Sequence, residues 1–190
     1  MIKSGDSVEM VHDVADAALD LAIVVHYDYD IKNLNHIQVS NPEKIICFAA
    51  SHQDIKKKTL DWKDLVDYPL VIGTEMSVIR KLIISKFKEK GLPDPPMAAE
   101  VGSVTWSKSL VENGKGLSFT LEKDIQKEVI EGRLKVVSLK DPLYITAEAV
   151  TRADILNPII EEFIQMVKEV FNYRDNKGAA PAAAGNAPLL

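Results

Sequence analysis

The chain has 190 residues, of which 46% are hydrophobic and 27% are charged, so it has enough apolar material for a folded core over most of its length. Its 23 basic and 28 acidic residues give a formal net charge of −5, which argues against non-specific electrostatic binding to nucleic acid or to anionic membranes. The single cysteine, Cys47, excludes an intrachain disulfide framework and fits a reducing, cytoplasmic setting. The sequence also lacks an apolar run of roughly 18 residues, as a membrane span needs, and a signal peptide.

The first part of the chain predicts one helix and two buried strands. The helix begins after Asp6, which has capping-box spacing to Glu9, and apolar residues follow at helical intervals. The runs Asp20–Val25 and Ile45–Ala50 are continuous and apolar, which is typical of strands buried on both faces, as in parallel sheets. Between them, residues 26–44 are polar and are predicted to be an excursion.

The rest of the foldable chain continues the alternation of strands and helices. A strand is predicted at Leu70–Gly73 and a helix over Ser77–Lys90, which Gly91 ends. Strands that alternate with helices predict right-handed crossovers and open α/β sheets. The later elements are strands at Ala98–Gly102, Gly116–Thr120, Leu134–Leu139 and Tyr144–Val150, and helices from Ser103, over residues 121–131, and from Pro158 with Asn157 as N-cap.

Common catalytic and metal-binding motifs are absent from the sequence. It has no GxSxG elbow, no HExxH pair and no GxxxxGK[ST] phosphate loop. The segment Gly114–Gly116 ends a helix and opens a strand, the reverse of the order that phosphate binding needs. Cys47 lies in an apolar run and is interpreted as a small buried hydrophobe. No metal-ligand spacing relates the histidines, which are His12, His26, His36 and His52.

Small polar residues cluster at the predicted helix starts. Each start offers unpaired backbone N–H groups and the positive end of a helix dipole, and ligands of open α/β sheets bind at the carboxyl ends of strands, where such starts gather. These residues therefore predict an anion-binding pocket, with helix capping alone as the alternative for any one of them. They are Gly5, Asp6 and Ser7, Thr74 and Ser77, Ser103 and Thr105, and Thr120.

An ordered series of blocks resembles the effector-binding domain of LysR-type bacterial transcriptional regulators. The resemblance covers about residues 2–172. The blocks are SGDSVEMVHDVADAALDLAIV, IICFAASHQ, LDWKDLVDYPLVIGTEMSVIR, EVGSVTWSKSLVENGKGLSFT and EVIEGRLKVVSLKDPLYITAEAVTR.

The resemblance implies a type 2 periplasmic-binding-protein fold. This is an α/β architecture with two Rossmann-like subdomains, whose sheets are mixed and mostly parallel, joined by two crossover segments. Subdomain I would comprise residues 1–46 and 145–174, subdomain II residues 47–144, and residues 175–190 a disordered tail or artificial extension. An anionic small-molecule effector would bind between the subdomains at the helix-start residues named above, without a metal or cofactor.

The family also has parts that this sequence does not contain. Its winged helix-turn-helix, and the first strand and helix of the effector domain, are missing, so the sequence resembles a domain truncated at its N-terminus. The resemblance implies a cytoplasmic, non-enzymatic homodimer (a tetramer when full length) that reaches DNA only through the missing domain and does not bind membranes. Position 120 is threonine, where the family often has proline.

Two other classes of protein remain open at this point. A solute-binding protein of a transport system has the same fold but needs a signal peptide or lipoprotein cysteine. An enzyme on this architecture needs a nucleophile or an acid–base pair, and Asp6 is the only acidic candidate at a helix start. The arginines nearest to the candidate pocket in sequence are Arg80, Arg133 and Arg152.

Overall fold

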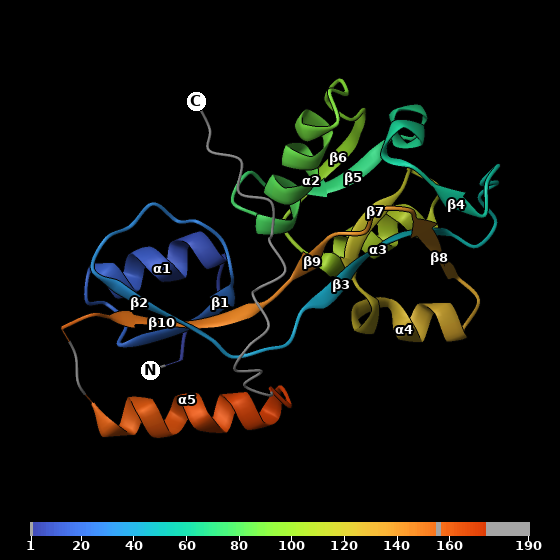
Figure 1. The fold of residues 1–190 in the computed structure, drawn as a ribbon. Coiled ribbons are helices and arrows are strands. Elements are labelled where there is room, and N and C mark those ends of the chain that lie inside the picture. Colours follow the sequence, from blue (N-terminus) through green and yellow to red (C-terminus); the bar gives the residue numbers. More distant parts are fainter. Residues whose placement is uncertain (1, 155–156, 174–190) are drawn as a thin grey trace. The chain divides into compact units, whose positions relative to one another are not determined.

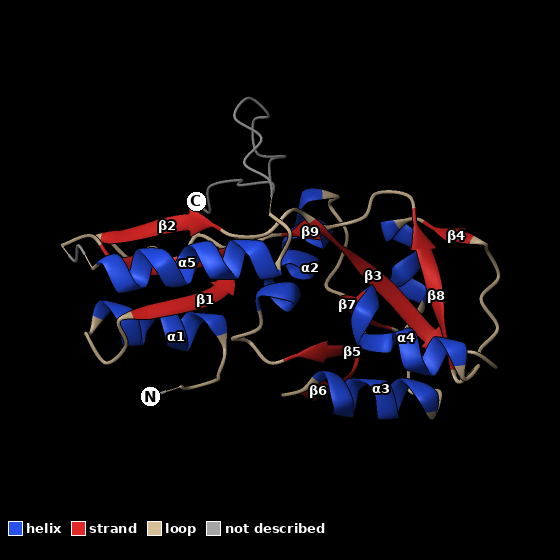
Figure 2. Ribbon diagram, turned by 90° about the horizontal axis from the view of Figure 1, so that it is seen from below, coloured by secondary structure: helices blue, strands red, loops and turns tan. Residues whose placement is uncertain are grey.

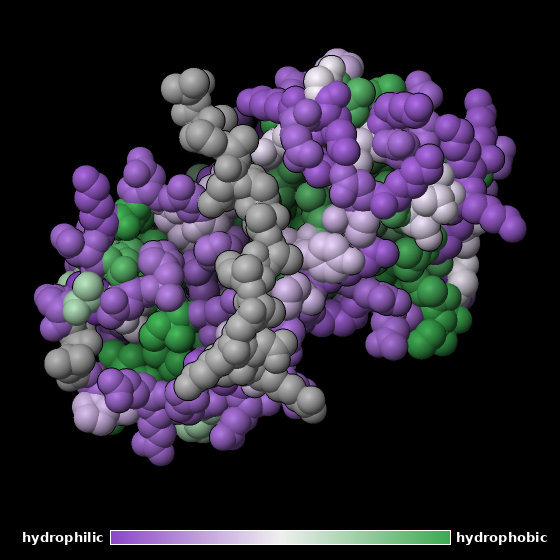
Figure 3. Space-filling model, viewed as in Figure 1, coloured by the Kyte–Doolittle hydropathy of each residue, from purple (hydrophilic) through white to green (hydrophobic). Residues whose placement is uncertain are grey.

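The computed structural model describes residues 2–154 and 157–173, so the expected tail at 175–190 lies outside the described residues. The chain divides into two compact units. Unit 1 combines Met1–Glu43 with Tyr144–Leu190, and unit 2 is the continuous segment Lys44–Leu143. Figure 1 shows the ribbon, and Figure 3 shows hydrophilic side chains over much of the visible surface, as a chain with 27% charged residues requires.

Unit 1 is built on a small antiparallel sheet. In the described part of the chain its three strands have the order β1-β10-β2. The central strand β10 (Ala147–Arg152) runs antiparallel to β1 (Leu21–Val25) and to β2 (Leu34–Gln38). The polar segment 26–44 was expected to be an excursion and instead contains β2, an edge strand whose side chains are mostly half-buried or exposed.

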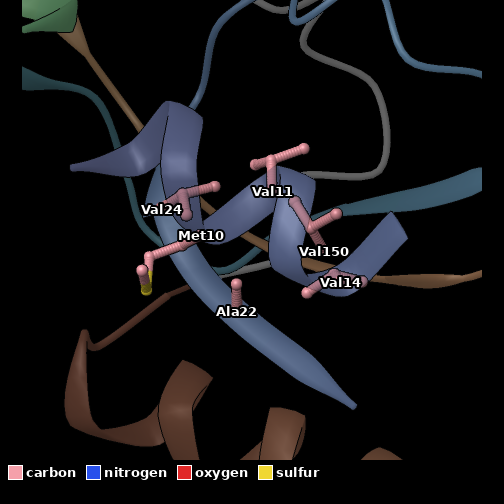
Figure 4. Close-up of a cluster of buried hydrophobic side chains, with 6 residues drawn as sticks. All are labelled: Met10, Val11, Val14, Ala22, Val24 and Val150. Atoms are coloured by element: carbon pink, nitrogen blue, oxygen red, sulfur yellow. The ribbon is translucent and has the colours of Figure 1, made fainter. Parts of the chain in front are cut away.

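Two helices cover opposite faces of this sheet (Figures 1 and 2). Helix α1 (Ser7–Ala15) buries Met10, Val11 and Val14 against Ala22, Val24 and Val150, the cluster drawn in Figure 4. Helix α5 (Pro158–Val170) places Ile164 against Ala149, with Leu21 and Ile37 packed around them. The strand residues packed against α1 alternate with those packed against α5, because successive strand residues point to opposite faces of the sheet.

Unit 2 is centred on the long buried strand β3 (Glu43–Ala50), which lies between β7 and β8. A parallel bridge between Leu70 and Leu117 joins the β5–β6 pair to the segment before β7. The helices pack a second core that includes Phe48, Val71 and Ile125. Its other elements are β4 (Thr59–Leu60), the 3-10 helix Trp62–Asp67, β5 (Leu70–Gly73), α2 (Val78–Glu89), β6 (Met97–Val101), α3 (Val104–Glu112), β7 (Ser118–Leu121), α4 (Glu122–Ile130) and β8 (Leu134–Leu139). The next strand, β9 (Tyr144–Ile145), belongs to unit 1.

The sheets are mixed, as expected, but the expectation that they are mostly parallel is wrong for the described strands. The pairs β1–β10, β10–β2, β3–β7 and β3–β8 are antiparallel, whereas β4–β8 and β5–β6 are parallel. The reason is that a continuous apolar run indicates burial on both faces and carries no information on direction. Strand β10 returns from unit 2 into the centre of the unit 1 sheet, and this fixes its antiparallel sense.

Candidate functional site

The start of α1 lies at the carboxyl end of β1, where Gly5, Asp6 and Ser7 were predicted to gather. The Ser7 hydroxyl accepts a hydrogen bond of 3.2 Å from the amide of Val25, the last residue of β1. Asp6 is the N-cap by backbone conformation, but among the described residues its exposed carboxylate makes no capping bond. The capping-box expectation is therefore wrong, because the carboxylate of Glu9 pairs instead with Lys3 at 2.8 Å.

A pocket opens beside this helix start. Its volume is about 370 Å³, and the segment from His26 to Lys32 lines it together with His36. The Tyr29 hydroxyl donates to the Val25 carbonyl and also contacts the side chain of Ser7. Burial raises the pKa of Tyr29 well above its ordinary value, so this hydroxyl stays protonated and acts as a donor. One of the predicted helix-start residues, Ser7, therefore contacts the pocket wall at the end of β1.

Two histidines of the pocket share one buried carboxylate. Glu148 is only 2% exposed, and its two carboxylate oxygens face His26 Nδ1 at 2.7 Å and His36 Nδ1 at 2.9 Å. The hydrogen bond to Glu148 is the main cause that raises the pKa of His26 above its ordinary value, and burial opposes it. This His26–Glu148–His36 cluster is the polar centre of the unit 1 site.

No sequence motif indicates this cluster, because its members lie far apart along the chain. His26 and His36 lie 122 and 112 residues from Glu148, and only the sheet order brings them to the two sides of β10. One local signal was available. Glu148 is the only charged residue among the first four residues of β10, and a charge in a buried strand needs partners.

In unit 2, two predicted helix starts lie at one sheet edge. Strands β5 and β6 are parallel with Gly73 opposite Val101, so Thr74 and Ser103 follow neighbouring strand ends. The Ser103 hydroxyl caps α3 by accepting from the Trp106 amide at 3.3 Å. In the same way, the Ser77 hydroxyl caps α2 by accepting from the Arg80 amide at 3.4 Å, while Thr105 lies exposed in the first turn of α3.

Thr120 has a different environment from the other predicted residues. It is 1% exposed, and its hydroxyl donates to the Asp124 carboxylate at 2.6 Å. The same carboxylate accepts from the Leu121 amide at 3.3 Å at the start of α4. The Thr120 hydroxyl therefore helps to fix the first turn of α4 and is buried.

Of the three arginines named from the sequence, Arg80 lies at this sheet edge. Its guanidinium donates to the Gly73 carbonyl at 3.1 Å and to the Glu100 carboxylate, and its side chain is 14% exposed. Arg133 pairs with Glu112 and Glu131, and Arg152 donates to the carbonyls of Val14 and Leu19. Trp106, which follows the Ser103 cap, is 66% exposed and adds an aromatic surface beside the helix start.

These sites offer hydrogen-bonding and charged side chains that can bind a small polar molecule. Within residues 2–154 and 157–173, histidines, cysteines and carboxylates form no group of three or more that could hold a metal ion. Cys47 is buried, and burial raises the pKa of its thiol far above the ordinary value, so it is not a nucleophile at neutral pH. The same described residues contain no helix with the length and apolar character needed to cross a bilayer.

Two α/β units with helix starts at strand ends place this protein among the α/β ligand-binding domains. The LysR substrate binding domain family matches residues 1–172, and the chain belongs to this family. The resemblance seen in the sequence blocks is thereby confirmed, and so is the α/β fold class with mixed sheets.

Relatives in sequence and structure support the same assignment. The chain is 25% identical over 136 residues to the HTH-type transcriptional regulator CbbR of Xanthobacter flavus, covering 72% of this chain and 41% of that protein. The chain thus spans about two fifths of the length of this curated relative. These matches are to transcriptional regulators, so they favour the regulator over the transport alternative.

Solved structures show the shared fold. The effector binding domain of QuiR in complex with shikimate has a TM-score of 0.76 at 19% identity, covering 88% of this chain and 79% of that one. The regulatory domain of CcmR from Synechocystis PCC6803 in complex with 2-PG has a TM-score of 0.79 at 18% identity, covering 91% and 83% of the two chains.

Proposed function

We propose that this effector-binding domain senses an anionic small molecule and transmits its binding to a DNA-binding domain outside the chain. The observation that carries the proposal is the sheet edge of unit 2, where α2 and α3 begin after neighbouring strand ends and the guanidinium of Arg80 bonds the Gly73 carbonyl. Free N–H groups and the dipoles of two helices favour an anion there. Shikimate and 2-PG, named with the QuiR and CcmR domains, are examples of small-molecule effectors in proteins of this fold.

The Arg80 guanidinium would be the positively charged group that binds the anion in this site. Its charge is partly neutralised by Glu100, which is about half exposed, and it is also tied to the strand end through the Gly73 carbonyl. A bound carboxylate or phosphate can replace Glu100 as the ion-pair partner of the Arg80 guanidinium, because Glu100 is exposed and can turn away. Binding that is tighter in one conformation of the domain shifts the population toward that conformation.

The experiment that tests this proposal uses the two tryptophans as probes. Trp62 is 1% exposed and Trp106 is 66% exposed, so fluorescence changes on ligand addition report mainly on the start of α3. We would titrate the protein with shikimate, 2-PG and inorganic phosphate and follow fluorescence and thermal stability. For the ligand that binds, Arg80→Gln should weaken affinity about 10- to 150-fold, since a lost charge-assisted bond costs about 1.5–3 kcal/mol.

Lys88→Gln is the matched control. Lys88 lies exposed near the other end of the same helix α2, and its substitution removes the same charge. Its affinity should stay within about twofold of the parent, because exposed charges more than a Debye length of about 8–10 Å away are screened. Equal losses in both variants would show that only net charge matters and would contradict a site at Arg80. No response in either readout to a wider set of carboxylates and phosphates would contradict effector sensing itself.

We also propose that two copies of the chain associate, as the family resemblance implies, through the outer side of α5. That side exposes a stripe of large apolar residues at helical spacing, while the inner side packs on the sheet. Such a stripe is stabilised by a like surface on a second copy. The stripe consists of Ile159, Phe163, Met166 and Val170.

The remaining parts of the proposal follow from the regulator assignment. We infer a cytoplasmic protein that neither catalyses a reaction nor holds a cofactor. It would contact DNA only through a helix-turn-helix domain such as the one in the name of its relative from Xanthobacter flavus. The net charge of −5 supports the placing of DNA binding in a separate domain, because a DNA-binding surface needs a basic patch.

A further inference from the structure

In the His26–Glu148–His36 cluster, two imidazoles share a carboxylate of β10, the central strand of the unit 1 sheet. Glu148 stands on β10 opposite Val24 of β1 and Gln38 of β2, on the face covered by α1. A carboxylate that is 2% exposed must be paired or hydrogen-bonded to stay ionised in such a place. Here both partners are imidazoles, the side chains whose ordinary pKa lies nearest to neutral pH.

Both imidazoles reach solvent while they bond the buried carboxylate. The side chain of His26 is 50% exposed and that of His36 is 34% exposed, whereas that of Glu148 is 3% exposed. Protons can therefore enter and leave the cluster without unfolding of the sheet. With both imidazoles neutral, the cluster has a charge of −1 inside the unit. One bound proton makes it neutral, so the first protonation removes an uncompensated buried charge.

The charged groups around the cluster come from the pocket wall. Asp28 adds an attraction for the protonated form of His26, and Asp30 and Lys32 line the same pocket. Tyr27 and Tyr29 also line it, and burial keeps Tyr29 protonated. Helix α1 contributes the uncharged hydroxyl of Ser7, and α5 packs against the opposite face of the sheet.

We propose that the His26–Glu148–His36 cluster is a proton-responsive contact that holds the pocket segment 26–33 to the central strand in mildly acid solution and releases it as the pH rises. Imidazole rings take up and release protons near neutral pH, so the proton is the ligand that this cluster can bind. The segment joins the end of β1 to β2 and includes Tyr29, which bonds the last residue of β1. Fixing His26 therefore fixes one wall of the pocket.

The direction of the pH effect follows from the raised pKa of His26. A histidine whose pKa is higher in the folded than in the unfolded state stabilises the fold at pH values below its unfolded pKa of about 6.5, and this contribution is lost as the pH rises through the folded pKa. The property belongs to unit 1 alone and does not depend on the identity of any effector.

The test is a histidine NMR titration of the full chain between pH 5 and 9, with amide hydrogen exchange of residues 26–33 as a second readout. We expect His26 in the parent protein to titrate above 6.5, the ordinary value. Glu148→Gln keeps the shape and can still bond both rings but removes the charge, so the upward shift of His26 should vanish. His36→Gln leaves the carboxylate to His26 alone and should raise the pKa of His26 further. Protection of the segment 26–33 should fall with rising pH in the parent and not in Glu148→Gln.

His12→Gln is the control, because His12 is an exposed histidine on α1 of the same unit. It should leave the titration of His26 unchanged. The proposal is overturned if His26 titrates at its ordinary value in the parent, or if His36→Gln lowers the pKa of His26. Should Glu148→Gln fail to fold, the proposal still requires that His36→Gln raise the pKa of His26 and that His12→Gln leave it unchanged. None of these readouts requires an effector, so a negative effector screen would leave them unaffected.

Discussion

The amide of Val25 donates to the hydroxyl of Ser7 over 3.2 Å, joining the last residue of β1 to the first residue of α1 across 18 positions of the chain. This bond satisfies a backbone N–H at the end of a strand, where the ladder with β10 stops, and it holds the helix start beside the pocket.

Ser7→Ala should lower the free energy of unfolding by about 1 kcal/mol, because it leaves the half-buried Val25 amide without its acceptor. Urea denaturation measures this change. Ser4→Ala is the matched control, since Ser4 is an exposed serine just before the helix, and its effect should stay within about 0.5 kcal/mol. A Ser7 variant as stable as the control would mean that water replaces the lost acceptor.

Trp62→Phe should destabilise the protein by about 2–3 kcal/mol. The indole of Trp62 is 1% exposed, stacks on Phe119, meets Phe87 edge-on, and donates to the Asp141 carbonyl at 2.8 Å. Phenylalanine leaves a void and an unpaired carbonyl. Trp106→Phe removes the same atoms from a side chain that is 66% exposed and should cost less than about 0.5 kcal/mol. The comparison is made by chemical denaturation, and similar losses in the two variants would contradict the buried packing of Trp62.

Phe163→Glu should dissociate the proposed homodimer, because it buries a charge in the apolar stripe of α5. Gln165→Glu adds the same charge to an exposed polar position of the same helix and should leave the dimer intact. Light scattering during gel filtration at micromolar concentration measures the mass. A monomeric parent protein, or a Phe163→Glu variant of unchanged mass, would place the dimer surface elsewhere or exclude it.

Lys108→Met should destabilise unit 2 by about 1–2 kcal/mol at neutral pH and by less in acid. The Lys108 ammonium donates to Glu128 at 2.7 Å and to the Asp124 carbonyl at 3.0 Å. The hydrogen bond from Lys108 is the main cause that lowers the pKa of Glu128 below its ordinary value of 4.5. A lowered carboxylate pKa stabilises the fold above 4.5, and this contribution is lost as the pH falls through the folded value.

The control for this pair is Lys127→Met, on the exposed side of α4. Lys127 is 79% exposed and lies 4.0 Å from Glu131, and exposed pairs contribute about 0–1 kcal/mol. Thermal melts of both variants at pH 3 and pH 7 make the comparison. A stability difference for Lys108→Met that is equally large at pH 3 and pH 7 would show that packing of the lysine stem matters and not its charge.

Local features of the fold were predictable because they depend on neighbours in the chain. Gly91 and Gly114 follow α2 and α3 with positive φ values of 65° and 71°, as their positions after apolar helical patterns predicted. Asn157 caps α5 through the Ile159 amide at 3.0 Å, with Pro158 at its first position, also as predicted. Strands β1 and β3 were found for the same reason, but only β3 is buried on both faces, because Ile23 in β1 is 36% exposed.

Other features of the site were beyond the reach of local patterns. Asp6 had the right type and spacing for a capping box, but Glu9 is engaged by Lys3. Arg80 was one of three arginines that the sequence could not rank, and only the parallel register of β5 and β6 places it beside Gly73 and Glu100. Thr120 belongs to the start of α4, because Asp124 accepts its hydroxyl.

The sequence by itself determined the family, the α/β class and the helix starts, since these depend on residue order, periodicity and capping chemistry within a few positions. Only the tertiary structure decided the antiparallel sense of β10, the edge strand β2 and the meeting of His26 and His36 on Glu148. Those relationships join residues more than a hundred positions apart. They are selected by the packing of helices on both faces of a sheet and by the need of a buried carboxylate for partners, which no stretch of sequence specifies alone.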